Sequence, residues 1–214
     1  MNRTTTLWIF LGVLIALQFG YPITFYGELW TAGYMLAYAA MILFGIRVVK
    51  LENTPTAPFF VLAVIMASCG LWFSLDQENQ TAQRLMLSSV GAFQLALLVS
   101  LVVFIVNPKK RAAATHLILA AISAYLLLGG VFAIAFNLLE TFSPGSFSDS
   151  GAPDRPLIWQ GLLYDSYVTL STLGYGDILP ISPWARSLVT LETVTGTLFI
   201  AIVIARLVGA PTDN

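Results

Sequence analysis

Long apolar stretches separated by short polar ones recur along the whole of this chain. A helix needs about 20 residues to cross the roughly 30 Å of hydrocarbon in a bilayer. Apolar runs of about that length are found at residues 7–25, 29–49, 58–75, 85–106, 117–139 and 184–208. This pattern predicts an all-α membrane protein with six transmembrane helices.

Residue composition agrees with a membrane location and argues against an enzyme. Hydrophobic residues make up 57% of the 214 residues and charged residues only 10%, with a mean hydropathy of +0.82, whereas charged residues are about a quarter of a soluble domain. The net charge of -1 offers no basic field for nucleic acid. The sequence has one histidine and one cysteine, Cys69, and it shows no metal-ligand spacing, nucleotide fingerprint or nucleophile elbow. We therefore expect no enzymatic activity, no cofactor and no nucleic-acid partner.

The cations between the apolar runs predict how the helices are oriented. An excess of Lys and Arg in short loops marks the cytoplasmic face. Both termini are then cytoplasmic in a multi-pass protein of the cell membrane, and the segment between the last two helices is external. The cytoplasmic side would carry Arg3, Arg47, Lys50, Lys109, Lys110, Arg111 and Arg206, against Arg84, Arg155 and Arg186 outside.

The external segment divides into a polar part and a more apolar part. Residues 140–156 are rich in Ser, Pro, Gly and Asp and show no periodicity, which predicts a mobile external turret. Pro156 can begin a short helix that runs to about Ser171, because the missing N–H of proline costs nothing in a first turn. Ser182-Pro183 has the same cap-then-proline pattern and predicts the start of the last helix.

After this short helix the sequence reads Thr172-Leu173-Gly174-Tyr175-Gly176-Asp177. Glycines on both sides of a tyrosine allow the backbone to turn consecutive carbonyl oxygens the same way. Four such lines around one axis, closed at the inner end by threonine hydroxyls, can replace the water shell of a potassium ion. One strand cannot enclose an ion and the motif is not repeated in the chain, so the pore must be assembled from several subunits.

This motif resembles the selectivity filter of the potassium channel family. Tyr-Val-Thr-Leu-Ser-Thr (167–172) resembles the second half of the family's pore helix, and the likeness extends from about Trp159 to Gly209. It implies a homotetramer with a re-entrant pore helix, K+ as the permeant ion and membrane lipid around it. The implied ion-coordinating positions are Thr172, Leu173, Gly174, Tyr175 and Gly176, with K+ bound at the first four of them. Because the spacing from Thr172 is similar, Gly196 corresponds to the gating hinge, although it can also be a point of close helix packing.

The residues expected to support this filter are Tyr164, Asp165, Val168, Asp177 and Glu192. In many family members two aromatic residues stand at the positions of Tyr164 and Asp165. An ionised aspartate can only accept hydrogen bonds, so we expect Tyr175 to donate to Asp165 and Tyr164 to donate to Asp177. Two carboxylates behind one filter repel, which raises the pKa of one of them. The alternative is that Asp165 is a solvated charge in the outer vestibule.

Glu192 lies within the last apolar run, four residues before Gly196. An acid at this depth is costly and usually functional. We expect it to tie the last helix to pore-helix hydroxyls such as Thr169 or Ser171. The alternative is that it faces the ion cavity.

The resemblance also suggests how the chain is divided. Residues 1–106 would form a four-span peripheral domain, 107–116 a cytoplasmic linker, 117–209 the pore domain and 210–214 a short tail. The pore domain contains, in order, an outer helix, the turret, the pore helix, the filter and an inner helix. The basic trio at 109–111 either attracts anionic lipid or only anchors the topology, and His116 either senses pH or has no specific role. Only five residues follow Gly209, so we expect no cytoplasmic ligand-binding domain.

Steep voltage gating is not expected, because it requires several charges per subunit within the field. Residues 85–106 contain no Lys or Arg. Two alternatives to a selective potassium channel remain. A weakly selective cation channel is one, since Leu173 lacks the β-branch more common at this position. A transport or sensory subunit is the other, which would use the few polar groups of the first four spans: Gln18, Ser68, Ser88, Ser89, Gln94 and Ser100.

Overall fold

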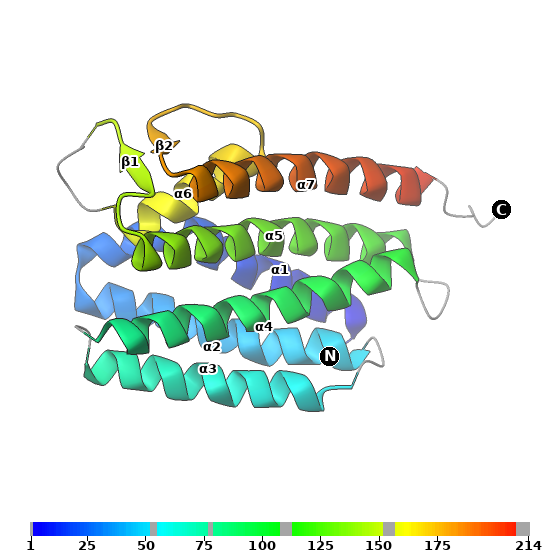
Figure 1. Ribbon diagram of the computed structural model, residues 1–214. Coiled ribbons are helices and arrows are strands. Elements are labelled where there is room, and N and C mark those ends of the chain that lie inside the picture. Colours follow the sequence, from blue (N-terminus) through cyan, green and yellow to red (C-terminus); the bar gives the residue numbers. More distant parts are fainter. Residues whose placement is uncertain (1, 52–54, 77–78, 108–112, 152–156, 209–214) are drawn as a thin grey trace. The chain divides into compact units, whose positions relative to one another are not determined.

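The computed structural model describes residues 2–51, 55–76, 79–107, 113–151 and 157–208 (Figure 1). The described chain is predominantly helical, as its apolar periodicity predicts. Its elements are α1 (Arg3–Phe19), a 3-10 helix η1 (Tyr21–Tyr26), α2 (Glu28–Leu51), α3 (Ala57–Leu75), α4 (Gln80–Val106), α5 (Ala114–Phe142), β1 (Phe147–Asp149), α6 (Trp159–Leu170), β2 (Ile178–Pro180) and α7 (Pro183–Val208).

Among the described residues, four helices are long and apolar enough to cross a membrane. They are α3, α4, α5 and residues Pro183–Arg206 of α7, with mean hydropathies of 2.0, 2.5, 2.4 and 2.1. The apolar helix α1 has 17 residues and ends at Phe19, whereas the sequence predicts a span to residue 25. The α-helix stops there because Pro22 has no N–H group to continue the helical hydrogen bonds, and the chain goes on as the 3-10 helix η1. The count of six spans stays a prediction.

The structure comprises two compact units. The first consists of residues 1–61, 95–127 and 199–214, and the second of residues 62–94 and 128–198. In the first unit, α1 packs on α2, with Phe10 and Leu14 completely buried. The Tyr34 hydroxyl of α2 donates to the Leu17 carbonyl at 2.6 Å. This bond satisfies a carbonyl in the last turn of α1 that has no partner within the helix.

Several polar contacts of the first unit involve residues predicted to be cytoplasmic. The Arg206 Nε donates to the Ile105 carbonyl at 3.2 Å, and the Arg3 guanidinium lies 4.7 Å from the centre of the Phe104 ring. Helix α5 begins at Ala114, so His116 lies in its first turn and not in the linker expected at 107–116. Its Nε2 is 2.9 Å from the Thr4 hydroxyl.

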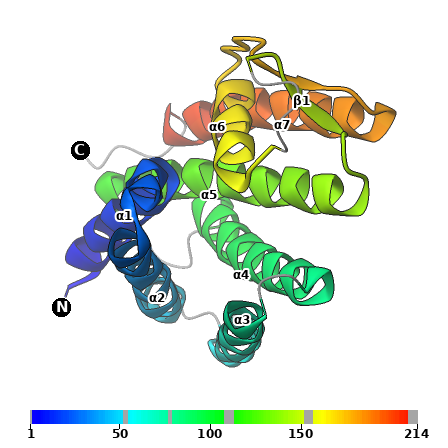
Figure 2. The same cartoon turned by 90° about the vertical axis from the view of Figure 1, so that its left-hand side faces the viewer.

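In the second unit, α6 lies against the parts of α5 and α7 that belong to this unit (Figure 2). Helices α5 and α6 approach closely at Gly129, where a Cβ atom would lie only 2.6 Å from the Tyr167 ring. Ser182 caps α7, as predicted, by accepting from the Ala185 N–H at 3.1 Å, and Pro183 is the first helical residue.

Part of the turret is ordered, contrary to the expectation from its composition. Helix α5 continues to Phe142, and Phe147–Asp149 form a strand that pairs antiparallel with Ile178–Pro180. A three-residue strand leaves no periodic signal in a sequence, and its partner lies about 30 residues further along the chain. Residues 152–156, including the expected helix start at Pro156, lie outside the described residues.

The close approach at Gly129 generates a stability prediction. Gly129→Ala should lower the thermal stability of the purified protein by about 1–3 kcal/mol, because the added methyl group overpacks against Tyr167. Gly12→Ala in α1 is the matched control, since no atom lies within 4 Å of the position that its methyl group would take. A Gly to Ala change alone favours a helix by about 1 kcal/mol, so equal stabilisation of both variants in thermal unfolding would contradict the packing.

Candidate functional site

The candidate filter begins directly after the C-terminus of α6. Helix α6 ends at Leu170, and Ser171 is its C-cap. The Val168 carbonyl accepts from the N–H groups of Leu173 at 2.9 Å and Gly174 at 3.3 Å. Val168, predicted as a support residue, therefore contacts the loop through its backbone oxygen. The negative end of the helix dipole lies at this terminus and favours cations near it.

The backbone of the loop alternates in handedness. The φ angles of Thr172, Gly174 and Gly176 are 60°, 57° and 75°, whereas Leu173 and Tyr175 are not in the positive region. Thr172 is the one non-glycine residue with positive φ in the described part of the chain. A β-branched residue in this region is strained by about 1–3 kcal/mol, and such strain is typical of functional sites. Alternating handedness is the backbone pattern that lets successive carbonyls turn the same way.

The side chains of the loop project from the single chain. Leu173 is 55% exposed and Tyr175 67% exposed. Large apolar groups exposed together usually mark a contact surface. The hydrogen bond predicted from Tyr175 to Asp165 is not made within the described chain, and the Asp165 Oδ2 atom has no partner there.

Asp177, at the outer end of the loop, is held by the short helix. The Tyr164 hydroxyl donates to its Oδ2 at 2.8 Å, which is the hydrogen bond predicted from the sequence. Partial burial, this bond and the Asp177 charge raise the pKa of Tyr164 to about 12. Tyr164 therefore remains a donor at any physiological pH.

Asp165 is buried behind the loop and is not solvated. Its side chain is 5% exposed. Burial, with a further contribution from the Asp177 charge, raises the pKa of Asp165 to about 7. This result favours the buried interpretation of Asp165, and a carboxyl group in this environment changes its charge near neutral pH.

Glu192 is buried in α7 and contacts α6. It is 0% exposed within the chain, so the alternative of a cavity-facing acid finds no support. Its Oε1 lies 2.6 Å from the Ser166 hydroxyl, which also lies 2.7 Å from the Gly129 carbonyl. Glu192 thus contacts a hydroxyl of α6, as expected, but the residue is Ser166 and not Thr169 or Ser171. Ser171 instead donates to the Tyr167 carbonyl at 2.7 Å. Ser166 could not be predicted as the partner of Glu192, because a single serine in a short helix belongs to no sequence motif.

Gly196 allows α7 to approach the end of α6. A Cβ atom there would lie 2.9 Å from the Leu170 carbonyl oxygen and 2.6 Å from its side chain. This contact supports the close-packing interpretation of Gly196. Its role as a gating hinge stays a prediction.

Comparison with known proteins agrees with this arrangement. A family model described as an ion channel matches residues 120–212. The inward rectifier potassium channel Kirbac3.1 of Paramagnetospirillum magnetotacticum is 35% identical over 82 residues, which are 36% of this chain and 24% of that protein. The two pore potassium channel c of Oryza sativa subsp. japonica is 34% identical over 90 residues, or 42% of this chain and 18% of that protein. No solved structure matches the chain.

The chain thus spans a quarter or less of the length of these two relatives. It spans most of the length of a third, smaller relative. The potassium channel protein kcv of Paramecium bursaria Chlorella virus 1 is 33% identical over 70 residues, which are 31% of this chain and 73% of the viral protein. Its match extends over nearly three quarters of a whole channel protein. The chain belongs to the potassium channel family.

Proposed function

We propose that four copies of this chain form a potassium-selective channel that conducts K+ passively across the cell membrane. The observation that carries this proposal is the alternating handedness at Thr172, Gly174 and Gly176, directly after α6. The carbonyl oxygens of Thr172 to Gly176, with the Thr172 hydroxyl, would then replace the hydration shell of the ion. Both termini would be cytoplasmic, as the distribution of Lys and Arg predicts.

A ring of identical subunits would bury apolar side chains that are exposed in a single chain. Leu173 and Tyr175 are exposed in the loop. In the second unit, helix α7 also exposes Leu191, Val194 and Leu198. Their spacing of three and four residues places them on one stripe of the helix. An exposed apolar stripe can face lipid or another subunit, and closed cyclic symmetry is the usual form of homo-oligomers. Non-helical backbone at membrane depth also has to be buried in protein or line a water-filled path.

The channel is not steeply voltage-gated in this proposal. Arg84, near the start of α4, is the one cation of that helix. Its guanidinium lies 4.4 Å from the Phe142 ring centre and donates to the Thr141 carbonyl at 3.1 Å. A single charge is worth about 2.3 kcal/mol per 100 mV even across the whole field. One anchored arginine therefore cannot produce a steep response.

Selectivity is tested by recording the purified protein in a planar bilayer with K+ on one side and Na+ on the other. The reversal potential should lie close to the K+ equilibrium value. Gly174→Ala and Gly176→Ala should each reduce the K+ over Na+ preference by at least about tenfold, because a side chain opposes positive φ. Gly70→Ala, with open space at its Cβ and no positive φ, is the control. A reversal potential near zero for the unmodified protein would support the weakly selective alternative, and no current at all would support the transport or sensory one.

The Glu192 contact predicts different effects of two substitutions. The Ser166 hydroxyl has one proton and two oxygens within reach, so a protonated Glu192 that donates to Ser166 satisfies both contacts. Glu192→Gln can donate in the same way and should keep assembly and selectivity. Glu192→Leu leaves the serine without this partner and should lower thermal stability by about 1–3 kcal/mol. Equal thermal stability of the two variants would rule this role out.

The raised pKa of Asp165 predicts a pH dependence with a definite sign. Because the folded-state pKa of about 7 exceeds the ordinary value of 3.8, the folded state binds more protons than the unfolded state between these values. Stability should therefore fall as pH rises from about 4 to 7 and then level off. Thermal unfolding at a series of pH values should show this fall, and Asp165→Asn should remove it. Tyr164, Asp177 and Glu192 are the neighbouring ionisable groups. An unchanged pH profile in Asp165→Asn would assign the dependence to one of them.

A further inference from the structure

The residue that ends the candidate filter is bound by the turret as well as by α6. The Ser150 N–H donates to the Asp177 carbonyl at 2.7 Å, and the Ser150 hydroxyl donates to the same oxygen at 2.9 Å. Tyr164 already holds the Asp177 side chain from α6. The backbone and the side chain of Asp177 are thus fixed by two different segments of the chain.

The contact continues along the segment that follows the filter. In the β1–β2 pair, Ser148 lies opposite Leu179 and Asp149 opposite Ile178. Beyond the strands, the Ser146 carbonyl accepts from the N–H groups of Ile181 at 2.8 Å and Ser182 at 3.2 Å. Residues 146–150 therefore lie alongside residues 177–182 over their whole length.

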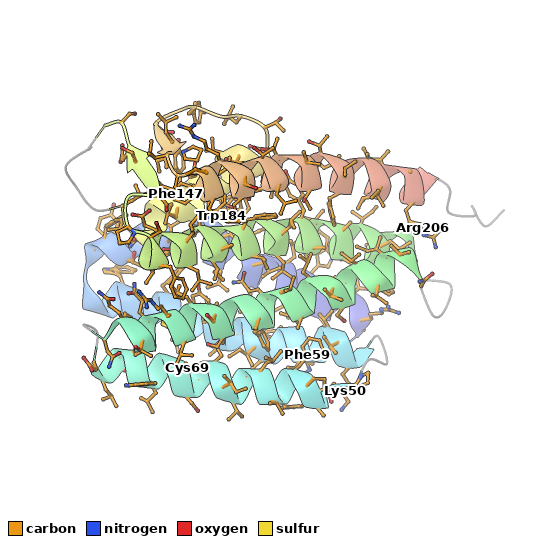
Figure 3. All side chains as sticks on the ribbon, in the orientation of Figure 1. Lys50, Phe59, Cys69, Phe147, Trp184 and Arg206 are labelled. Carbon is orange, nitrogen blue, oxygen red and sulfur yellow. The ribbon has the colours of Figure 1, made fainter. Side chains whose placement is uncertain are left out.

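The other end of this turret segment is anchored to α5 by a carboxylate. Glu140 lies in the last turn of α5, and its two oxygens accept from the Gly145 N–H at 2.7 Å and the Phe147 N–H at 3.0 Å. Gly145 has φ of 82°, which favours glycine in this turn. The side chain of Phe147, which is labelled in Figure 3, is buried. The centre of its ring lies 5.0 Å from that of Phe136 in α5. Hydrogen bonds to an ionised acceptor are stronger than neutral ones, so Glu140 fixes the start of β1 firmly.

We propose that residues 140–150 form an outer clamp that positions the exit of the ion filter, with Glu140 and Ser150 as its positioning residues. This inference rests on the proposed function and adds to it residues outside the filter motif. The strained loop 172–176 has no strand pairing of its own in the described chain. Its inner end is tied to Val168, and the clamp ties its outer end to α5. Carbonyl oxygens turned toward one axis repel one another when K+ is scarce, so an untied exit should leave the conducting geometry more readily.

The clamp is tested in single-channel recordings of assembled channels at low and high external K+. Ser150→Ala keeps the backbone bond and loses the hydroxyl bond, whereas Glu140→Gln leaves one N–H group facing an amide donor. Each should shorten the mean conducting time at low external K+ by about fivefold, the factor expected for one hydrogen bond. High external K+ should restore it, because bound ions hold the carbonyl line. A merely structural defect would not depend on external K+.

Two further variants complete the experiment. Ser150→Thr retains the hydroxyl and should behave like the unmodified channel. Ser148→Ala removes a hydroxyl from β1, two residues before Ser150, and is the control, since the Ser148 side chain has no hydrogen bond in the described chain. If Glu140→Gln does not assemble, Ser150→Ala decides the outcome because it removes one oxygen atom only. A potassium-selective channel in which Ser150→Ala matches Ser148→Ala would overturn the clamp alone, whereas an unmodified protein without K+ selectivity would overturn the proposed function.

Discussion

The backbone of residues 172–176 cannot hold its conformation by itself, and the surrounding second unit is arranged around that constraint. Thr172 has φ of 60° although it is β-branched, and two glycines continue the alternation. The loop itself belongs to neither a helix nor a strand. Its support therefore comes from outside, through the Val168 carbonyl at one end and Asp177 at the other. Strain of this kind persists only where the surroundings determine the geometry more strongly than the local preference does.

Two buried carboxyl groups stand behind this loop, and both have an oxygen without a partner in the described chain. These are Asp165 on α6 and Glu192 on α7. A buried charge without compensation is far more costly than a buried neutral acid. The Ser166 hydroxyl has one proton and two neighbouring oxygens, which agrees with a protonated, neutral Glu192. Asp165, with a pKa of about 7, can change its charge near neutral pH. The loop is thus backed by groups whose charge is set by burial.

The sequence was sufficient for features that repeat or that belong to a local motif. The long apolar runs and the cap at Ser182-Pro183 follow from periodicity and from neighbouring residues, whereas the Tyr164–Asp177 bond was expected from the resemblance to the potassium channel family. The Ser166–Glu192 contact, the two bonds from Ser150 and the β1–β2 pair could not be predicted. Each joins residues more than twenty positions apart through a single short polar residue or a three-residue strand. The composition of the turret segment that contains β1 favours turns equally well. Only the packed structure therefore distinguishes an ordered strand from a loop there.

In the proposed channel, the loops of four subunits together form one line of ion sites. Crystals of the assembled protein grown with Rb+ in place of K+ would test it most directly, because anomalous scattering locates Rb+ without reference to the protein. We expect a row of Rb+ sites on a four-fold axis, next to the carbonyl oxygens of Thr172, Leu173, Gly174 and Tyr175. An assembly without a four-fold axis, or an axis without Rb+ beside these residues, would contradict it.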